Sequence, residues 1–328
     1  MLNLSKKVLF LATTSTLMSV STVAFAADNY PQKPITFVIG FPPGTSTDAI
    51  ARIIGEKISS ELKQPVIVEN KPGVGGSLAV TQVSKAKPDG YTLVLSATAP
   101  MNINPHVYKS ISYDPIKDFE PIGQTTWLPY VLVSNNSKGI KSFSSLIDYA
   151  KNNPGALTYA SIGNGTTSHL LMELLTKSTG TKMTHVPYSG SSQAQTDIIG
   201  GNVDITFDTL VSALPHIKSG KLNPLAVSVN QRAQLAPDIP TIEELGIPNF
   251  NMGAWLGFFA PKGTPEPIIQ KLHQEINKAV TDPVINQRLT ALGSEVVTSN
   301  SPEEFSKMVS DNYHVWGNIV KDTGLEKK

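Results

Sequence analysis

Four short loops in this chain have a composition that suits the binding of a small anion. They span residues 42–48, 97–100, 163–168 and 187–192, and together they contain ten Ser or Thr residues and four Gly residues but no Lys or Arg. Their hydrogen-bond donors are therefore neutral hydroxyl groups and backbone N–H groups. A hydrogen bond to a charged group contributes about 1.5–3 kcal/mol. Micromolar binding requires about −8 kcal/mol, so a few such bonds and some buried ligand surface would hold a small carboxylate.

The first of these loops connects a predicted strand to a predicted helix. Residues 35–39 are almost entirely apolar, which is typical of a strand buried on both faces. The Pro-Pro-Gly sequence at 42–44 ends the strand, and three hydroxyl residues at 45–47 stand where a helix needs an N-cap. Such a turn presents free N–H groups and the positive end of a helix, which suits an anion. An ordinary strand-to-helix connection has the same features, so both interpretations stay open here.

The sequence contains no pattern that is typical of a catalytic site. It has no Gly-x-Ser-x-Gly, Gly-x-Gly-x-x-Gly or Walker sequence, and its six histidines include no His-x-x-x-His pair. Adjacent carboxylates occur only at 243–244 and 303–304, where both pairs begin predicted helices and complement the helix dipole. We therefore expect a binding protein rather than an enzyme, with no metal site and no cofactor.

The first 26 residues have the features of a cleavable signal peptide. Lys6 and Lys7 precede an uncharged apolar stretch that ends in Ala24-Phe25-Ala26, an A-x-A cleavage pattern. The chain has no cysteine for a disulfide or a lipid anchor. Removing two lysines takes the formal charge from +1 to −1, and no basic run suited to a phosphate backbone is present. We expect an exported, periplasmic protein that does not bind nucleic acid.

Strand and helix patterns alternate along the rest of the chain, which predicts an α/β fold with parallel-rich sheets and helices on both faces. The first part has strands at 35–39, 66–69 and 92–96 and helices at 47–62 and 77–86. The second part has strands at 157–161, 183–186, 204–207 and 224–229 and helices at 143–151, 168–179, 192–199 and 210–218. The last part has strands at 255–260 and 295–298, with helices at 265–280, 283–292 and from 301 onward.

The order of these elements predicts two domains. Residues 27–128 with 230–328 are expected to form domain 1 and residues 129–229 domain 2, with extended pieces at 121–124 and 130–134 at the first crossing. Two crossing strands can form a hinge. Because ligands bind beyond the carboxyl ends of parallel strands, we expect the four loops to face a cleft between the domains. The turn at 72–76 is expected to be an edge loop of domain 1 without a ligand role.

Short motifs recur in order along the whole mature chain and carry a resemblance to a known family. They are Tyr30-Pro31-x-Lys33-Pro34-Ile35, Phe41-x-Pro43-Gly44-x-x-x-Asp48 with Ala51-Arg52, Val68-Glu69-Asn70-Lys71-Pro72-Gly73 with Gly75-Gly76, Pro88-Asp89-Gly90-Tyr91-Thr92-Leu93, Gly163-x-Gly165 ahead of His169-Leu170, Val186-Pro187-Tyr188-x-Gly190, Leu225-Ala226-Val227, Pro237-x-x-Pro240-Thr241-x-x-Glu244-x-Gly246 and Ala260-Pro261-x-Gly263-Thr264-Pro265. The chain thus resembles the Bug-type periplasmic substrate-binding proteins of tripartite tricarboxylate transporters. One departure is Thr45, where the family usually has a second glycine.

The resemblance implies a type II periplasmic-binding-protein fold that closes about a two-strand hinge on a small organic carboxylate. The ligand would be a di- or tricarboxylate, an aromatic carboxylate or an amino acid, and its receiver the inner-membrane transporter subunits. We expect a monomer. The expected ligand-binding residues lie in or beside the four loops: Phe41, Pro43, Gly44, Thr45, Ser46, Thr47, Ala97, Thr98, Gly163, Asn164, Gly165, Thr166, Thr167, His169, Tyr188, Ser189, Gly190 and Asp208.

The roles of several residues stay open in the sequence. Phe41 either stacks on the ligand or packs at the strand end, and His169 either contacts the ligand or packs within its helix. Asp208 either receives a ligand amino or hydroxyl group or caps the helix at 210–218. Trp127 either lines the cleft or packs at the hinge. Two other functions are considered: a periplasmic hydrolase or isomerase that uses His169 or Asp208, and a sensor subunit that presents its closed form to a membrane receptor.

Overall fold

The structure is a computed structural model that describes residues 30–325. The predicted signal peptide at 1–26 lies outside the described residues. Within residues 30–325, no helix is both long enough and apolar enough to cross a membrane.

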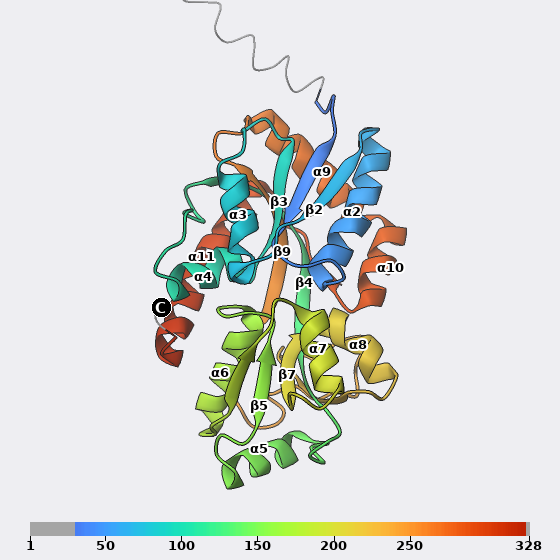
Figure 1. The fold of residues 1–328 in the computed structure, drawn as a ribbon. Coiled ribbons are helices and arrows are strands. Elements are labelled where there is room, and N and C mark those ends of the chain that lie inside the picture. Colours follow the sequence, from blue (N-terminus) through green and yellow to red (C-terminus); the bar gives the residue numbers. More distant parts are fainter. Residues whose placement is uncertain (1–29, 326–328) are drawn as a thin grey trace, which may run out of the picture.

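One continuous sheet runs through the molecule (Figure 1). Its strand order is β2-β1-β3-β9-β4-β7-β5-β6, and β8 and β10 also pair with β4. The strands are β1 (Ile35–Ile39), β2 (Val66–Asn70), β3 (Thr92–Ala97), β4 (Phe119–Ser134), β5 (Thr158–Ser161), β6 (Thr184–Pro187), β7 (Ile205–Thr209), β8 (Asn223–Val227), β9 (Gly253–Pro261) and β10 (Glu295–Val296). The pairs β1–β2, β1–β3, β5–β6 and β5–β7 are parallel, whereas β9 and β4 pair antiparallel with their neighbours.

Helices cover both faces of the sheet, as the alternating pattern predicted. They are α2 (Ser46–Leu62), α3 (Ser77–Ser84), α4 (Asn104–Val107), α5 (Phe143–Asn152), α6 (Thr167–Thr179), α7 (Ser191–Ile199), α8 (Leu210–Lys218), α9 (Glu266–Thr281), α10 (Pro283–Leu292) and α11 (Pro302–Thr323). The amphipathic helices α2 and α9 bury Ile54 and Ile276 on one face of β1 and β3, while α3 and α11 bury Val83 and Phe305 on the other. These contacts confirm the predicted α/β class.

Figure 1 shows two lobes, with β1–β3, α2, α3 and α9–α11 in the upper lobe and β5, β7 and α5–α8 in the lower one. The upper lobe is called lobe 1 and the lower lobe 2. One cluster of buried apolar side chains extends from Phe37 and Leu95 of lobe 1 through Leu128 and Tyr130 to Leu171 of lobe 2. The faces that the lobes turn toward each other are therefore apolar as well as hydroxyl-rich. The domain boundaries given above remain a prediction.

β4 differs from the two separate extended pieces that the sequence predicts. It is one strand of 16 residues that pairs with β9 as far as Pro129 and with β7 from Tyr130 onward. Pro129 has no backbone N–H and would interrupt most strands. It is accommodated here because it lies where β4 exchanges one partner for the other. The pairing of β4 with β9 therefore ends at Pro129, while the strand itself continues.

A second difference follows β3. The sequence predicts a small-residue loop at 97–100, but a single π-helical turn, η2 (Ala99–Ile103), begins there and continues into α4. Thr98 is fully buried, and its Oγ1 accepts a hydrogen bond from the Trp255 backbone N–H at 3.0 Å. This bond ties the end of β3 to β9.

We expect Gly257→Ala to destabilise the β4–β9 pair. A Cβ at this position would overlap the Phe305 ring and lie 3.0 Å from the Gly123 carbonyl oxygen. Overpacking of this kind costs about 1–3 kcal/mol, measured as the free energy of unfolding in urea. In a Phe305→Leu background, where the obstructing ring is smaller, the same substitution should cost less. Equal costs in the two backgrounds would contradict this packing.

Candidate functional site

A small cavity lies where the two lobes meet. Its volume is about 20 Å³, close to the space that one water molecule needs. Both lobes contribute to its wall: Phe41, Thr45, Ser46, Thr47, Ala97, Ala99, Leu128, Tyr130, Ile162, Thr166, Thr167, Ser191, Thr209, Ala254 and Leu256. These residues include seven hydroxyl groups besides the Tyr130 phenol and no charged side chain. The cavity is therefore lined by neutral donors and apolar carbon.

The turn between β1 and α2 forms the lobe 1 side of the cavity. Thr45 is the N-cap of α2, but its side chain does not cap the helix, because Thr45 Oγ1 donates to the Pro42 carbonyl oxygen at 2.8 Å. Ser46 and Thr47 follow as the first helical residues, and both are buried. The first N–H groups of a helix have no acceptor within the helix. They lie at its positive end beside the cavity.

The turn between β5 and α6 forms the lobe 2 side and has the same local structure. Its N-cap, Thr166, has φ −79° and ψ 162°, against −79° and 165° for Thr45. Thr166 Oγ1 also turns away from its helix and donates to the Gly163 carbonyl oxygen at 2.7 Å. The start of α6 is therefore uncapped by a side chain, like the start of α2. We call these two turns, residues 42–48 and 163–169, the first and second jaws.

A second contact is common to both jaws. The Gly44 N–H donates to Asp48 Oδ2 at 2.9 Å, and the Gly165 N–H donates to His169 Nδ1 at 3.2 Å. Both glycines have positive φ, 81° and 70°, which other residues rarely adopt. Gly-Thr-Ser-Thr-Asp at 44–48 and Gly-Thr-Thr-Ser-His at 165–169 are thus equivalent segments. This repeated five-residue pattern is a signal that the sequence analysis missed.

The starts of α7 and α8 complete the polar part of the wall. Ser191 is the first residue of α7, and Thr209 caps α8 by accepting from the Ser212 N–H at 3.3 Å. Asp208 lies behind them and is fully buried. Its carboxylate accepts from Ser191 Oγ and Gln195 Nε2, both at 2.8 Å, and from the Thr209 N–H at 2.7 Å. Asp208 therefore joins β7 to α7, and the side-chain cap of α8 is Thr209.

Burial determines the ionisation of Asp208. It raises the pKa of the carboxyl to about 6, and the hydrogen bonds from Gln195, Ser191 and Thr209 act in the opposite direction. The Tyr130 phenol is also buried, and it lines the cavity together with Thr167. Its pKa is raised well above the ordinary tyrosine value by burial and by the Asp208 charge. Tyr130 therefore stays a neutral hydroxyl at the cavity.

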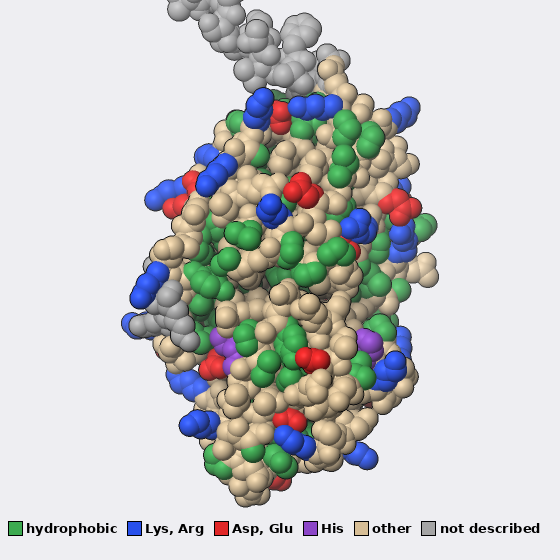
Figure 2. All heavy atoms as spheres, in the orientation of Figure 1, with side chains coloured by type: hydrophobic (Ala, Val, Ile, Leu, Met, Phe, Trp, Pro, Cys, Tyr) green, Lys and Arg blue, Asp and Glu red, His purple; other side chains and the backbone are tan. Residues whose placement is uncertain are grey.

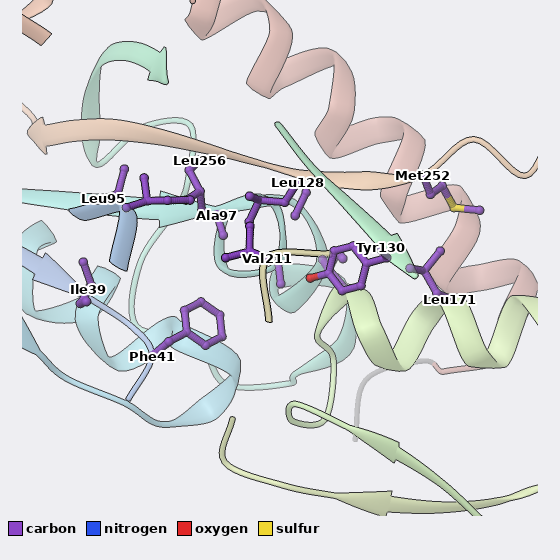
Figure 3. Close-up of a cluster of buried hydrophobic side chains, with 14 of the residues drawn as sticks. Ile39, Phe41, Leu95, Ala97, Leu128, Tyr130, Leu171, Val211, Met252 and Leu256 are labelled. Atoms are coloured by element: carbon purple, nitrogen blue, oxygen red, sulfur yellow. The ribbon is translucent and has the colours of Figure 1, made fainter. Parts of the chain in front are cut away.

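The remaining wall of the cavity is apolar. Figure 3 shows Phe41, from the loop after β1, and Tyr130, from β4, on opposite sides, with Ala97, Leu128 and Leu256 beside them. Ala254, Leu256 and Leu128 come from the β9–β4 pair at the centre of the sheet. This wall would face the carbon skeleton of a ligand whose polar end lies at the jaws.

A larger groove of about 500 Å³ opens beside the cavity. On one side it is lined by the turn at 72–76, and on the other by Gly163, Asn164, Tyr188 and Ser189. Tyr108 spans it, because its hydroxyl donates to the Asn164 carbonyl oxygen at 2.7 Å. The turn expected to be an edge loop thus lies at the mouth between the lobes, facing the second jaw.

The structure brings most of the expected residues to this region, in three positions. Phe41, Thr45, Ser46, Thr47, Ala97, Thr166 and Thr167 line the cavity, while Gly163, Asn164, Tyr188 and Ser189 line the groove. Pro43, Gly44, Thr98, Gly165, His169, Gly190 and Asp208 line neither and lie in or behind the loops. Tyr188 turns its hydroxyl to Asp197 at 2.6 Å. Trp127 packs on β9, since a Cβ at Gly253 would lie 2.6 Å from its ring.

Sequence reasoning missed Leu128, Tyr130, Ala254 and Leu256, which lie within strands rather than at their ends. It also missed Ala99, Ile162, Ser191 and Thr209, although Ala99 and Ser191 stand in loops that it singled out and Ile162 directly precedes one. Their position beside the predicted loops was the available signal.

One charged side chain connects the lobes without an ion pair, because the Lys177 ammonium of α6 donates to the Asp322 carbonyl oxygen of α11. Every salt bridge among residues 30–325 lies within one lobe or its adjoining segment, and none joins the two jaws. In Figure 2 most Lys, Arg, Asp and Glu side chains lie toward the periphery of the visible face. In the same part of the chain, no group of three or more His, Asp or Glu side chains is placed to hold a metal ion.

We expect the buried Asp208 to make stability depend on pH. Its pKa of about 6 exceeds the ordinary value of 3.8, so the folded state binds the proton more tightly than the unfolded state. The contribution of protonated Asp208 to the free energy of unfolding is fully present below the pKa of the unfolded carboxyl, and it is lost as pH rises through about 6. Between pH 4 and 7.5 the free energy of unfolding of the wild type should fall by at most about 3 kcal/mol relative to that of Asp208→Asn. Urea unfolding at several pH values measures this, with the exposed Asp238→Asn as the control. A pH-independent difference would contradict it.

Comparison with known proteins now identifies the family. The family described as tripartite tricarboxylate transporter family receptor matches residues 50–325. Protein BugT of Bordetella pertussis is 35% identical over 321 residues, which cover 98% of this chain and 97% of BugT.

Solved structures of similar proteins support the same family assignment. An R. palustris protein with adipate has a TM-score of 0.88 at 31% identity, over 91% of this chain and 100% of its own. The periplasmic binding protein BugD has a TM-score of 0.87 at 34% identity, over 91% and 100%. MatC from Rhodopseudomonas palustris with bound malate has 0.84 at 33% identity, over 89% and 100%. These proteins are binding proteins by family and fold, and the chain belongs to the tripartite tricarboxylate transporter receptor family, the Bug-type periplasmic solute-binding proteins.

Proposed function

We propose that this protein captures a small organic carboxylate between its lobes and delivers it to inner-membrane subunits of a tripartite tricarboxylate-type transporter. The observation that carries the proposal is the convergence of two uncapped helix starts, those of α2 and α6, on one cavity lined without any charged side chain. A carboxylate placed there accepts hydrogen bonds from both jaws, and the helix dipoles favour its charge. The adipate and malate in two related structures support this class of ligand.

The ligand-binding residues that we propose are those of the two jaws and the walls beside them. Ser46, Thr47, Thr166 and Thr167 supply hydroxyl and backbone N–H donors from the two lobes. Phe41, Ala97 and the β4–β9 wall contact the carbon skeleton. Asp208 acts through Ser191 and Gln195, because its oxygens are already hydrogen-bonded to them.

Binding requires the lobes to move apart and close again. A cavity of about 20 Å³ is far too small for malate or adipate, which supports the proposal that the lobes separate to admit a ligand. We propose that the units 27–128 with 230–328 and 129–229 rotate about the point where β4 exchanges β9 for β7. The Tyr108–Asn164 hydrogen bond then forms on closure and covers the mouth. Opening exposes the jaws to solvent.

Delivery explains the choice of neutral donors. Hydroxyl and N–H groups hold a carboxylate without the strong charge–charge attraction that a buried arginine would add, so release stays fast.

Export through the segment at 1–26 and action as a periplasmic monomer complete the proposal. The enzyme alternative finds no support, since His169 Nδ1 is engaged by Gly165 and the Asp208 oxygens by Ser191, Gln195 and Thr209. A sensor role would share the same site.

A screen of ligands tests the proposal. We expect malate, adipate, aromatic carboxylates or acidic amino acids to raise the melting temperature of the mature protein, with affinities then measured by calorimetry. Because no side-chain cation is involved, affinity should fall only about two- to threefold between 0.05 and 0.5 M NaCl. Stabilisation by sugars or cationic peptides but by no carboxylate would contradict the ligand class. A steep salt dependence would contradict the neutral site.

Filling the first jaw should abolish binding without unfolding the protein. Thr45 is 5% exposed and faces lobe 2, since a Cβ at Gly190 would lie 3.5 Å from Thr45 Cγ2. In Thr45→Trp the indole cannot fit the closed cavity, so the lobes should stay apart. We expect a larger radius of gyration by small-angle scattering, unchanged circular dichroism and no ligand-induced rise in melting temperature. Thr45→Ser, which keeps the hydroxyl, is the control. Retained affinity in Thr45→Trp would show that this turn does not bind the ligand.

A further inference from the structure

The two jaws share two hydrogen bonds and differ in the side chain that accepts one of them. In each, a glycine with positive φ precedes the N-cap threonine, and its N–H donates to the side chain three residues after that threonine. That side chain is an aspartate in the first jaw and a histidine in the second. Both side chains are buried, with 5% of Asp48 and 6% of His169 exposed. The acceptor thus has a different chemistry at two equivalent positions.

Asp48 is held in its ionised form. Although burial alone would raise its pKa, the hydrogen bonds from Arg52, Gly44 and Asn70 together hold the pKa below the ordinary aspartate value. Arg52 approaches Asp48 Oδ1 to 2.8 Å. Asn70 Nδ2 donates both to Asp48 Oδ1 and to the Phe41 carbonyl oxygen, each at 3.0 Å. The first jaw therefore keeps its acceptor throughout the neutral and mildly acidic range.

His169 lies in a different setting. Its Nδ1 accepts from Gly165, so the proton of the neutral ring is on Nε2, which lies 3.8 Å from Glu173 Oε1. The ring stacks on His185 of β6 with centroids 4.0 Å apart. The Tyr159 ring of β5 lies 4.8 Å from the His185 ring and 6.4 Å from the His169 ring, and its hydroxyl donates to Glu173. Tyr108 of lobe 1 approaches Gly165, since a Cβ there would lie 3.2 Å from its ring. Glu173, His185, Tyr159 and Tyr108 are the titratable groups facing this part of the second jaw.

We propose that Asp48 and His169 are equivalent positioning residues, each holding its jaw glycine and so aiming the first helical N–H groups at the ligand, and that acid releases the second jaw alone. Histidine gains its proton between about pH 5 and 8. A protonated Nδ1 carries a hydrogen and cannot accept from the Gly165 N–H, so the two donors would face each other. Glu173 would hold the charged ring in place, and the loop at 163–166 must then move.

The consequence for binding rests on the proposed function. The second jaw supplies half of the carboxylate's donors, so its displacement weakens binding while the first jaw stays in place. Loss of one such positioning hydrogen bond corresponds to about a three- to tenfold lower affinity. A ligand would therefore be held less tightly in an acidic periplasm than at neutral pH.

Three proteins separate this role from simple packing. Wild type has an acceptor only while His169 is neutral, His169→Asn has an amide oxygen at about the same distance along the side chain at every pH, and His169→Ala has none. NMR of the ligand-free protein follows the amide signals of Gly165 and Gly44 between pH 5 and 8. We expect the Gly165 signal of the wild type to titrate with the midpoint of the His169 ring, which should be the Nε2-protonated tautomer at pH 8. The Gly44 signal should stay constant, and neither signal should titrate in His169→Asn.

The binding arm uses malate and adipate, measured by calorimetry at pH 7.5 and 5.5. Wild type should match His169→Asn at pH 7.5 and fall about three- to tenfold below it at pH 5.5, toward His169→Ala. The ratio of two proteins at one pH cancels the ionisation of the ligand itself. The proposal is overturned if the Gly165 signal does not follow the His169 ring, or if His169→Asn keeps the pH dependence of the wild type. If neither acid binds, the proposed function fails for these ligands and the NMR titration still decides the positioning role.

Discussion

The first backbone N–H groups of α2 and α6 impose the constraint on which the rest of the structure depends. At both helices the N-cap threonine donates its hydroxyl to a carbonyl of its own loop, which leaves the helix start without a side-chain cap. Buried donors without an acceptor cost free energy. One anion between the two starts would satisfy donors of both lobes at once, whereas the cavity between the lobes has room for only about one water molecule. Ligand binding and closure then stabilise each other. The ligand supplies the acceptor for the buried N–H groups, and closure brings the N–H groups of both lobes to the ligand.

β4 makes it possible for two remote helix starts to meet. The strand pairs with β9 up to Pro129 and with β7 from Tyr130. The course of β4 at this point therefore sets how the two lobes are oriented relative to each other. Tyr130 follows the exchange directly and lines the cavity together with Thr167 at the start of α6. A change of twist near this point would move the second jaw relative to the first while the strand stays continuous. The proposed hinge and the site therefore share residues of β4, and cavity-lining side chains such as Leu128 lie within that strand.

Local pattern was sufficient for much of the fold and for part of the site. The apolar run of β1, the breaking Pro-Pro-Gly and the hydroxyls at 45–47 define a strand, a turn and a helix start within one short segment, and the structure has each where the pattern predicts it. The wall formed by Leu128 and Leu256 was out of reach, because it depends on the register of β4 with β9 across more than a hundred residues. The partners of Asp208 were also out of reach, since Ser191 and Gln195 approach it only through the packing of α7 on β7.

The resemblance of the two jaws also explains the residue that departs from the family pattern. Thr45 stands where a glycine is usual, and in lobe 1 it does what Thr166 does in lobe 2: each donates its hydroxyl to its own loop and leaves the amides beyond it uncapped. A glycine N-cap would leave these amides equally uncapped, since it has no side chain. Thr45 is therefore compatible with the anion binding that we propose for the turn, and its hydroxyl fixes the loop that glycine would leave free. Its methyl group also faces Gly190 of lobe 2, so at this point the lobes meet through carbon atoms rather than through an ion pair. Such a contact is insensitive to salt, so under the proposed function the charge of the ligand decides whether the lobes stay together.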